Sequence, residues 1–210
     1  TYEIKQIMTL TAEDVLPENT VGVGDADPAE VGWDEYFGYG RLNLGAAVEA
    51  MAAGGIPPEV LIETPAWWAM LDPEAQDRVT LSGHVAAPRS SACTLSVQWA
   101  PGVSPLDSEL ITFDGLNEVD CSTGLDGVIA DFPLGVVADE FEGSRTGANP
   151  TDPNQFVFTV RIVATDADGR TGEDRKTYFV YHDPTWHEGW PKLVDTGGET
   201  SPLLYDIDGN

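Results

Sequence analysis

The chain has 210 residues, of which 41% are apolar and 22% charged, so it can bury at least one substantial core. Ten basic residues stand against thirty-six acidic ones, for a formal net charge of −26. A surface this acidic repels nucleic acid and anionic membranes, so both are set aside as partners. It is typical of calcium-rich secreted proteins and of proteins adapted to high salt, and composition does not separate these two classes.

The first expected element is a helix that begins after Asn43. This residue is a good N-cap, and the segment that follows is rich in alanine and other helix-forming residues. Apolar residues recur at i, i+3, i+4 and i+7, and Gly54-Gly55 ends the helix. The apolar stripe consists of Leu44, Ala47, Val48 and Met51. Periodicity alone predicts an ordinary surface helix.

The residues around this helix carry a family resemblance. GYGRLN at 38–43, followed by the alanine-rich helix, closely resembles the closing segment of subtilisin-like serine proteases (subtilases), in which such a turn leads into the last helix of the catalytic domain. EIKQIM at 3–8 resembles the family's VKQIL helix, and TLTAEDV at 9–15 resembles its TADDV continuation. Residues 1–57 are therefore interpreted as the C-terminal segment of a subtilase catalytic domain.

The catalytic part of that family is absent from this sequence. The resemblance implies a nucleophile in a Gly-Thr-Ser-Met-Ala motif, with the catalytic Asp and His further upstream, and none of these motifs occurs in the chain. We therefore assign no catalytic residue, and the implied peptide-bond hydrolysis belongs to a parent protein. Without the rest of the protease domain, another surface must cover Ile4, Ile7, Leu44 and Val48. We expect it to be the sandwich described next, a second copy, or the remainder of the protease.

Residues 58–183 read as a mainly β, antiparallel immunoglobulin-like β-sandwich. Residues 78–85 alternate well, with Val79, Leu81, Gly83 and Val85 facing one way. Asp166 to Arg170 form a strong hairpin turn, and the sequence around it resembles the last hairpin of immunoglobulin-like or fibronectin-like modules. Residues 135–154 are interpreted as a solvated connection or a binding loop. The expected strands are 59–63, 78–85, 93–99, 110–113, 128–134, 155–165 and 176–182.

Residues 184–210 resemble the opening of an FG-GAP or VCBS-type β-propeller repeat. In those repeats an Asp-x-Asp-Gly loop holds calcium through oxygen ligands at alternate positions, and its glycine permits a sharp turn. The resemblance implies that Asp206, Asp208 and Asn210 supply the first three calcium ligands. The alternative interpretation is a plain Asp-Gly turn.

Other metal sites are weaker candidates. Asp25 and Asp27 could be metal ligands, but an exposed acidic loop is the commoner explanation. His182 and His187 are five residues apart and close to Asp183 and Glu188, which suggests zinc, but no third ligand has a recognised spacing. His84 lies on the polar face of an expected strand, where we predict a solvated ring.

The cysteines and tryptophans each allow two interpretations. Cys93 and Cys121 form a disulfide if the protein is secreted, which we favour, or remain as buried thiols. The pair Trp67-Trp68, like Trp186 and Trp190, stacks on sugars or binds a peptide if exposed, and packs at a domain junction if buried. We favour packing at a junction.

Two functions from different classes follow. The first is the non-catalytic C-terminal region of a secreted subtilisin-like serine endopeptidase, serving as a spacer or accessory module, whose partner is the missing remainder of the protease domain. The second is an extracellular sandwich that binds a protein or a glycan, in which proteolysis is incidental. Binding to residues 59–183 that depends on Trp67 or Trp68 would favour the second.

Overall fold

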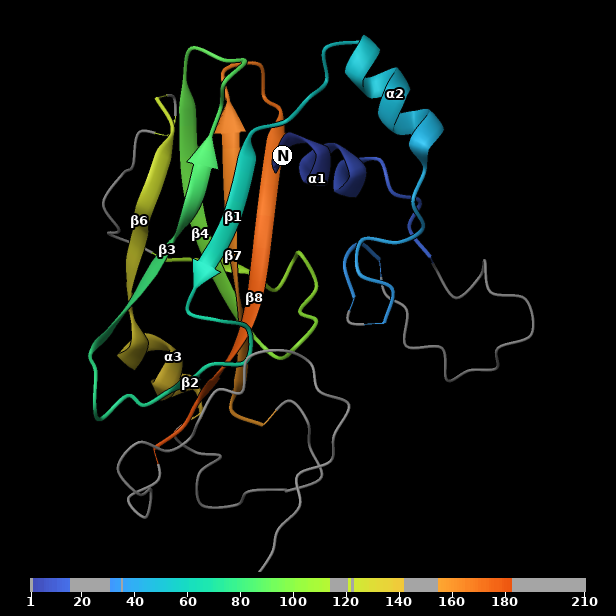
Figure 1. Cartoon of the computed structure of the whole chain (residues 1–210). Coiled ribbons are helices and arrows are strands. Elements are labelled where there is room, and N and C mark those ends of the chain that lie inside the picture. The colour runs from blue at the N-terminus through green and yellow to red at the C-terminus, as the bar shows by residue number, and fades with distance from the viewer. Residues whose placement is uncertain are drawn as a thin grey trace, which may run out of the picture.

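A computed structural model describes residues 2–15, 31–34, 36–113, 121, 123–141 and 155–182. Figure 1 shows two short helices beside a β-sandwich and a third helix at the opposite end. The elements are α1 (Tyr2–Leu10), α2 (Leu44–Ala52), β1 (Glu59–Thr64), β2 (Met70–Leu71), β3 (Arg78–Ala86), β4 (Cys93–Pro101), β5 (Ile111–Thr112), β6 (Leu125–Pro133), α3 (Leu134–Phe141), β7 (Val157–Asp166) and β8 (Thr171–Val180).

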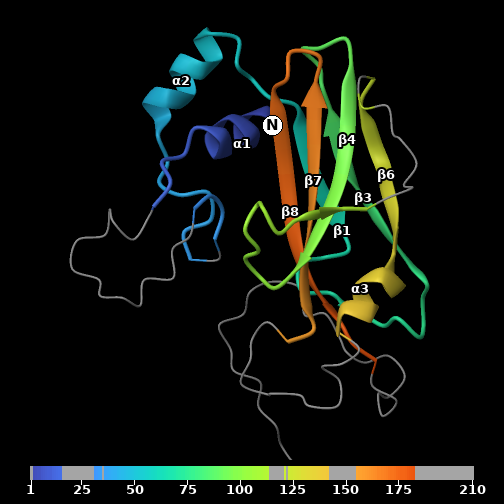
Figure 2. The ribbon, with the colours of Figure 1, turned by 180° about the vertical axis from the view of Figure 1, so that it is seen from behind.

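The strands form two sheets. One has the order β1-β3-β6 and is antiparallel throughout. The other has the order β2-β8-β7-β4-β5, and only β2 in it runs parallel to its neighbour. Figures 1 and 2 show the two sheets as the layers of a sandwich, which confirms the predicted mainly β class. The described residues contain eight strands, whereas the sequence predicts seven. The additional strand is β2, whose two residues are too few to show an alternating pattern.

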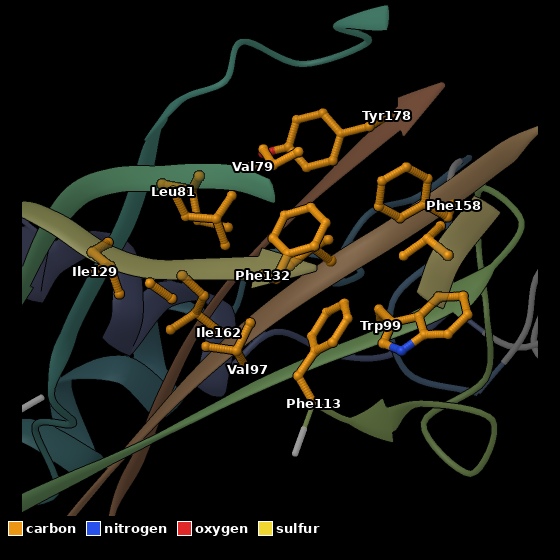
Figure 3. Close-up of a cluster of buried hydrophobic side chains, with 14 of the residues drawn as sticks. Val79, Leu81, Val97, Trp99, Phe113, Ile129, Phe132, Phe158, Ile162 and Tyr178 are labelled. Atoms are coloured by element: carbon orange, nitrogen blue, oxygen red, sulfur yellow. The ribbon is translucent and has the colours of Figure 1, made fainter. Parts of the chain in front are cut away.

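The core lies between the sheets and is rich in aromatic rings. In β3, Val79, Leu81 and Val85 are buried, which confirms the predicted alternation. Phe132 of β6 is fully buried, and its ring centroid lies 5.0 Å from that of Phe113 and 6.1 Å from that of Phe158 (Figure 3). Side chains from both sheets thus meet in one apolar cluster, which supplies the main stabilisation of the sandwich.

The hairpin between β7 and β8 is confirmed. Gly169 has a φ of 78°, a conformation that a turn residue with a side chain rarely adopts. The Asp166 carboxylate accepts hydrogen bonds from the backbone N–H groups of Asp168 (2.9 Å) and Arg170 (3.0 Å). In the expected strand 155–165, Phe156, Phe158, Val160 and Ile162 alternate on one face, which predicts one buried face, but β7 is buried on both. The β4–β5 connection covers the second face, where Thr159 donates to the carbonyl of Gly102.

The segment 135–154 was predicted to be a connection without regular structure, and its first part is not. Residues 134–141 form α3, which buries Leu134, Val137, Ala138 and Phe141. This spacing is that of a helical stripe, and Gly135 together with the flanking acidic residues obscured it. Residues 142–154 lie outside the described part of the chain.

The predicted disulfide is present. Cys93 and Cys121 are bonded to each other and buried, so the start of β4 is tied to the segment before β6. The free-thiol alternative is therefore wrong.

The helices near the N-terminus occur where the sequence predicts them. Asn43 caps α2, because its Oδ1 accepts a hydrogen bond from the N–H of Ala46 at 2.9 Å. Ala47 is buried, but Leu44 and Val48 are 62% and 65% exposed. The apolar stripe of α2 is thus mostly uncovered. On α1, Ile7 is buried while Ile4 is exposed, so the sandwich covers only part of this segment.

The remaining sequence assignments lie outside the described residues. These are the acidic loop with Asp25 and Asp27, and the whole of 184–210 with Asp206, Asp208 and Asn210. None of the helices in the described part of the chain has the length and apolarity needed to cross a membrane.

Candidate functional site

The most elaborate polar arrangement lies where the N-terminal segment (described residues 2–15, 31–34 and 36–57) meets the sandwich; we call this contact the junction. α1 lies beside β1 and β8, which belong to different sheets. Gln6 of α1 is buried and bonds to both strands. Its Nε2 donates to the carbonyls of Val60 and Glu173, and its Oε1 accepts from the N–H of Glu173, all at 2.9 Å. One amide therefore links α1 to both sheets.

An ion pair next to Gln6 reinforces this link. Lys5 of α1 pairs with Oδ1 of Asp174 on β8. Oδ2 of the same carboxylate accepts a hydrogen bond from the N–H of Ile62 on β1 at 2.7 Å. Gly172 allows the close approach of β8, because a Cβ there would lie 2.0 Å from the carbonyl oxygen of Pro58. The junction is thus a built contact and not a flexible linker.

The loop before α2 packs on the buried side chain of Arg175. The guanidinium carbon lies 5.2 Å from the ring centroid of Trp33 and 5.9 Å from that of Tyr39. Its Nη2 donates to Oε1 of Glu173 at 2.8 Å. Burial alone would lower the pKa of Arg175, but Glu173, together with Tyr39 and Asp107, outweighs it and raises that pKa. Burial also raises the pKa of Tyr39, so both groups keep their usual charge states at neutral pH.

A second arginine extends this network across the outer face of the larger sheet. Nη1 of Arg161 on β7 lies 2.6 Å from Oδ1 of Asp107 and 3.3 Å from Oε2 of Glu173. Its Nε donates to Oε1 of Gln98 on β4 at 2.9 Å. Because both arginines share the same carboxylates, removing Glu173 would leave two buried cations short of partners.

A cavity of about 280 Å³ opens beside these groups. α1, the turn that contains Asp14, the loop that contains Trp33 and Tyr39, and β8 line it. Three of its lining residues carry a buried polar atom for which the described residues provide no hydrogen-bond partner: Nε of Arg175, the hydroxyl of Tyr39 and Oδ1 of Asp14. Such atoms require water or a polar ligand. The cavity therefore suits a small polar molecule that offers both a donor and an acceptor.

The paired tryptophans lie at the edge of the sandwich. Trp67 is 36% exposed and packs against Trp33, with ring centroids 6.4 Å apart. Trp68 is 41% exposed and packs against Phe179 at 5.5 Å. Trp67 thus packs at the junction, as expected, because Trp33 belongs to the N-terminal segment. Both rings nevertheless keep solvent-exposed surface.

The histidines differ from the prediction made for them. His84 is not solvated, because its ring lies between Glu59 and Asp126 and under the ring of Tyr2. The alternation places it correctly on the polar face of β3 but does not reveal that Tyr2 of α1 covers the ring. Nδ1 of His182 lies 3.1 Å from both carboxylate oxygens of Asp72.

Neither histidine belongs to a metal centre within the described ranges. Residues 2–15, 31–34, 36–113, 121, 123–141 and 155–182 contain no group of three or more His, Cys, Asp or Glu side chains arranged to hold a metal ion. His187, the second residue of the zinc candidate, lies outside these ranges.

Sequence reasoning missed the polar residues of the junction. Gln6, Asp174 and Arg175 were not recognised as functional, although GEDRK at 172–176 places four charged residues in succession within an apolar strand pattern. That charge run was the available signal. No known family model matches the chain, and comparison with curated proteins also gives no match.

Proposed function

We propose that this chain is the non-catalytic C-terminal region of a secreted subtilisin-like serine endopeptidase. Residues 1–57 would complete the catalytic domain, and the sandwich would be an accessory module attached to it. The parent protein would hydrolyse peptide bonds with a serine outside this chain. The sequence resemblance of 3–15 and 38–53 supports this proposal, and the disulfide is in keeping with a secreted protein.

The proposal is supported by the two sides of the N-terminal segment, one bound to the sandwich and the other exposed and apolar. One side is held on the sandwich by Gln6 and Lys5. The other presents Leu44, Val48 and Met51 on one exposed face of α2. Adjacent exposed apolar side chains usually mark an interface. A folded unit placed against α2 would cover them and would be fixed relative to the sandwich through the junction.

The test uses the full-length product of the gene. A fluorophosphonate probe, which reacts with activated serines, is added before and after heat denaturation, and the labelled peptide is mapped. We expect label on a serine upstream of Thr1 in the native protein only. The 210-residue chain alone is the matched control and should stay unlabelled. A native full-length protein without label or proteolytic activity would contradict the proposal.

The same proposal includes calcium. If residues 184–210 open a propeller repeat, Asp206, Asp208 and Asn210 supply oxygen ligands in the order that Ca²⁺ prefers. Calcium should then raise the unfolding temperature of the full-length protein, and Asp208→Asn should weaken this effect, whereas Asp168→Asn in the β7–β8 turn should not. If calcium raises the unfolding temperature of both variants equally, a calcium site at 206–210 is contradicted.

A second function, an extracellular protein- or glycan-binding module, is favoured by Trp67 and Trp68. Trp68 has a φ of 64°, a strained conformation for so bulky a residue, and such strain is often kept at binding sites. Its exposed ring would stack on a sugar or a peptide side chain. Glycan and peptide arrays should show saturable binding that Trp68→Ala abolishes and Ile111→Ala, at an exposed site on β5, leaves unchanged. Binding that survives Trp68→Ala would contradict this function.

A further inference from the structure

His84 lies at the centre of a polar cluster under the first turn of α1. Its Nδ1 is 2.6 Å from Oδ1 of Asp126 on β6, and its Nε2 is 2.9 Å from Oε2 of Glu59 on β1. Both neighbours are carboxylates, which accept hydrogen bonds and cannot donate them when ionised. A neutral imidazole carries one N–H and can satisfy only one of them. The doubly protonated ring alone can donate to both.

The same cluster holds the start of α1. The ring of Tyr2 stacks on the imidazole, with centroids 4.3 Å apart and planes 24° from parallel. Oε1 of Glu59, the oxygen that does not face His84, accepts a hydrogen bond from the N–H of Glu3 at 3.2 Å. That N–H belongs to the first turn of the helix, where it has no intrahelical partner. The carboxylate of Glu3 is in turn bound by Arg89 at 2.7 Å.

We propose that protonated His84 holds the first turn of α1, and with it the N-terminal segment, on the β1-β3-β6 sheet. This contact weakens when the ring loses its proton. A cationic ring strengthens the stacking with Tyr2 and donates to both carboxylates at once. When the ring loses its proton, Asp126 or Glu59 loses its donor and the attraction to Tyr2 decreases. This device concerns the attachment of α1 and does not depend on the protease assignment.

The charged surroundings agree with this direction. Burial of the ring opposes protonation, but the hydrogen bonds to Asp126 and Glu59 outweigh it and raise the pKa of His84 above its usual value. Asp126 is 86% exposed, so solvent screens much of its share, and Glu59 is the stronger partner. The other charged groups near the first turn are Glu3 and Arg89, which neutralise each other, and Lys5, which pairs with Asp174.

The sign of the pH dependence follows. Because the pKa is raised in the docked state, the stabilisation is complete below the pKa of the free ring, about 6.5, and is lost as pH rises through the raised value. α1 is therefore expected to be held more firmly in mildly acidic than in alkaline solution. The opposite trend holds for carboxylates whose pKa is lowered, so the two effects can be told apart.

The test is hydrogen exchange of the backbone amides of α1 in the complete 210-residue chain between pH 5.5 and 8.5, corrected for intrinsic rates. Protection of α1 should fall by about fivefold across this range, the size expected for a partly screened charged contact, while protection of β7 stays constant. In His84→Gln, which cannot be protonated, α1 protection should not change with pH. The matched control is His182→Gln, since His182 pairs with Asp72 and does not contact α1; it should keep the wild-type profile.

Two results would overturn the proposal. One is α1 protection in the wild type that does not depend on pH. The other is a pH dependence that persists in His84→Gln. If His84→Gln does not fold, NMR of the wild type decides: the His84 ring and the amides of Tyr2 and Glu3 should titrate with one midpoint, and separate midpoints would refute the coupling.

Discussion

Replacing Gln6 by methionine tests the junction most sharply. Methionine keeps the length and the apolar part of the side chain but removes all three hydrogen bonds to Val60 and Glu173. Two carbonyls and one N–H then lose their partner in a buried contact. Each unsatisfied group costs about 1–3 kcal/mol, and because the two contacts to Glu173 are only partly buried we expect a total loss of about 2–4 kcal/mol.

The loss can appear in two ways, and both are measured. If α1 and the sandwich unfold together, the unfolding temperature falls by about 5–15 °C for a chain of this size. If α1 detaches alone, the unfolding temperature changes little and hydrogen exchange of α1 accelerates about thirtyfold or more. The matched control is Gln76→Met at an exposed turn position, which should change stability by less than about 0.5 kcal/mol. A Gln6→Met protein with unchanged unfolding temperature and unchanged α1 exchange would refute the account of the junction.

Three further predictions concern the sandwich. Phe132→Ala should cost about 3–5 kcal/mol in urea unfolding, because it empties the centre of the core, and a loss below that of Phe132→Leu would contradict this. Removing the disulfide by replacing Cys93 and Cys121 with alanine should cost about 3–4 kcal/mol on the chain-entropy account, and an unchanged urea midpoint would argue against it. Burial opposes ionisation of Asp166, but hydrogen bonds from Arg170 outweigh it and lower its pKa. This stability is present above the unfolded-state pKa of about 3.9 and is lost as pH falls through the lowered value, so Asp166→Asn should flatten the acid side of the stability curve.

The sandwich could be predicted because its information is local. β3 alternates apolar and polar residues, and the Asp-Gly turn fixes the β7–β8 hairpin. Both patterns follow from backbone geometry and from one buried face. The disulfide follows from the even number of cysteines in a chain interpreted as secreted. The same reasoning found the N-cap of α2 at Asn43.

The errors arise where distant segments meet. Gly135 and the nearby acidic residues indicate a loop where a short helical stripe forms α3. The alternation of β7 predicts one buried face, because it does not show that the β4–β5 connection covers the other. The local sequence predicts a solvated ring for His84 and no special role for Gln6, because it does not show that α1 packs on the sandwich. Partners separated by many residues determine these environments.

The exposed apolar stripe of α2 requires a partner surface in the parent protein. Among the described residues, Leu44, Val48 and Met51 stay 62%, 65% and 49% exposed, and the buried apolar side chains of α1 and α2 are Ile7 and Ala47. A short helix with few apolar contacts is a low-stability element. In the proposed parent protein, the rest of the catalytic domain covers the stripe. The junction then holds that domain in a fixed position relative to the sandwich.

Probe labelling of the full-length protein, with the labelled serine mapped, tests the central claim most directly. The account predicts label on a serine in a Gly-Thr-Ser-type turn shortly before Thr1, present in the native protein and absent after denaturation. A full-length protein that carries no such serine, or whose serine does not react, would contradict it. The sandwich would then have to be explained as a binding module centred on Trp67 and Trp68.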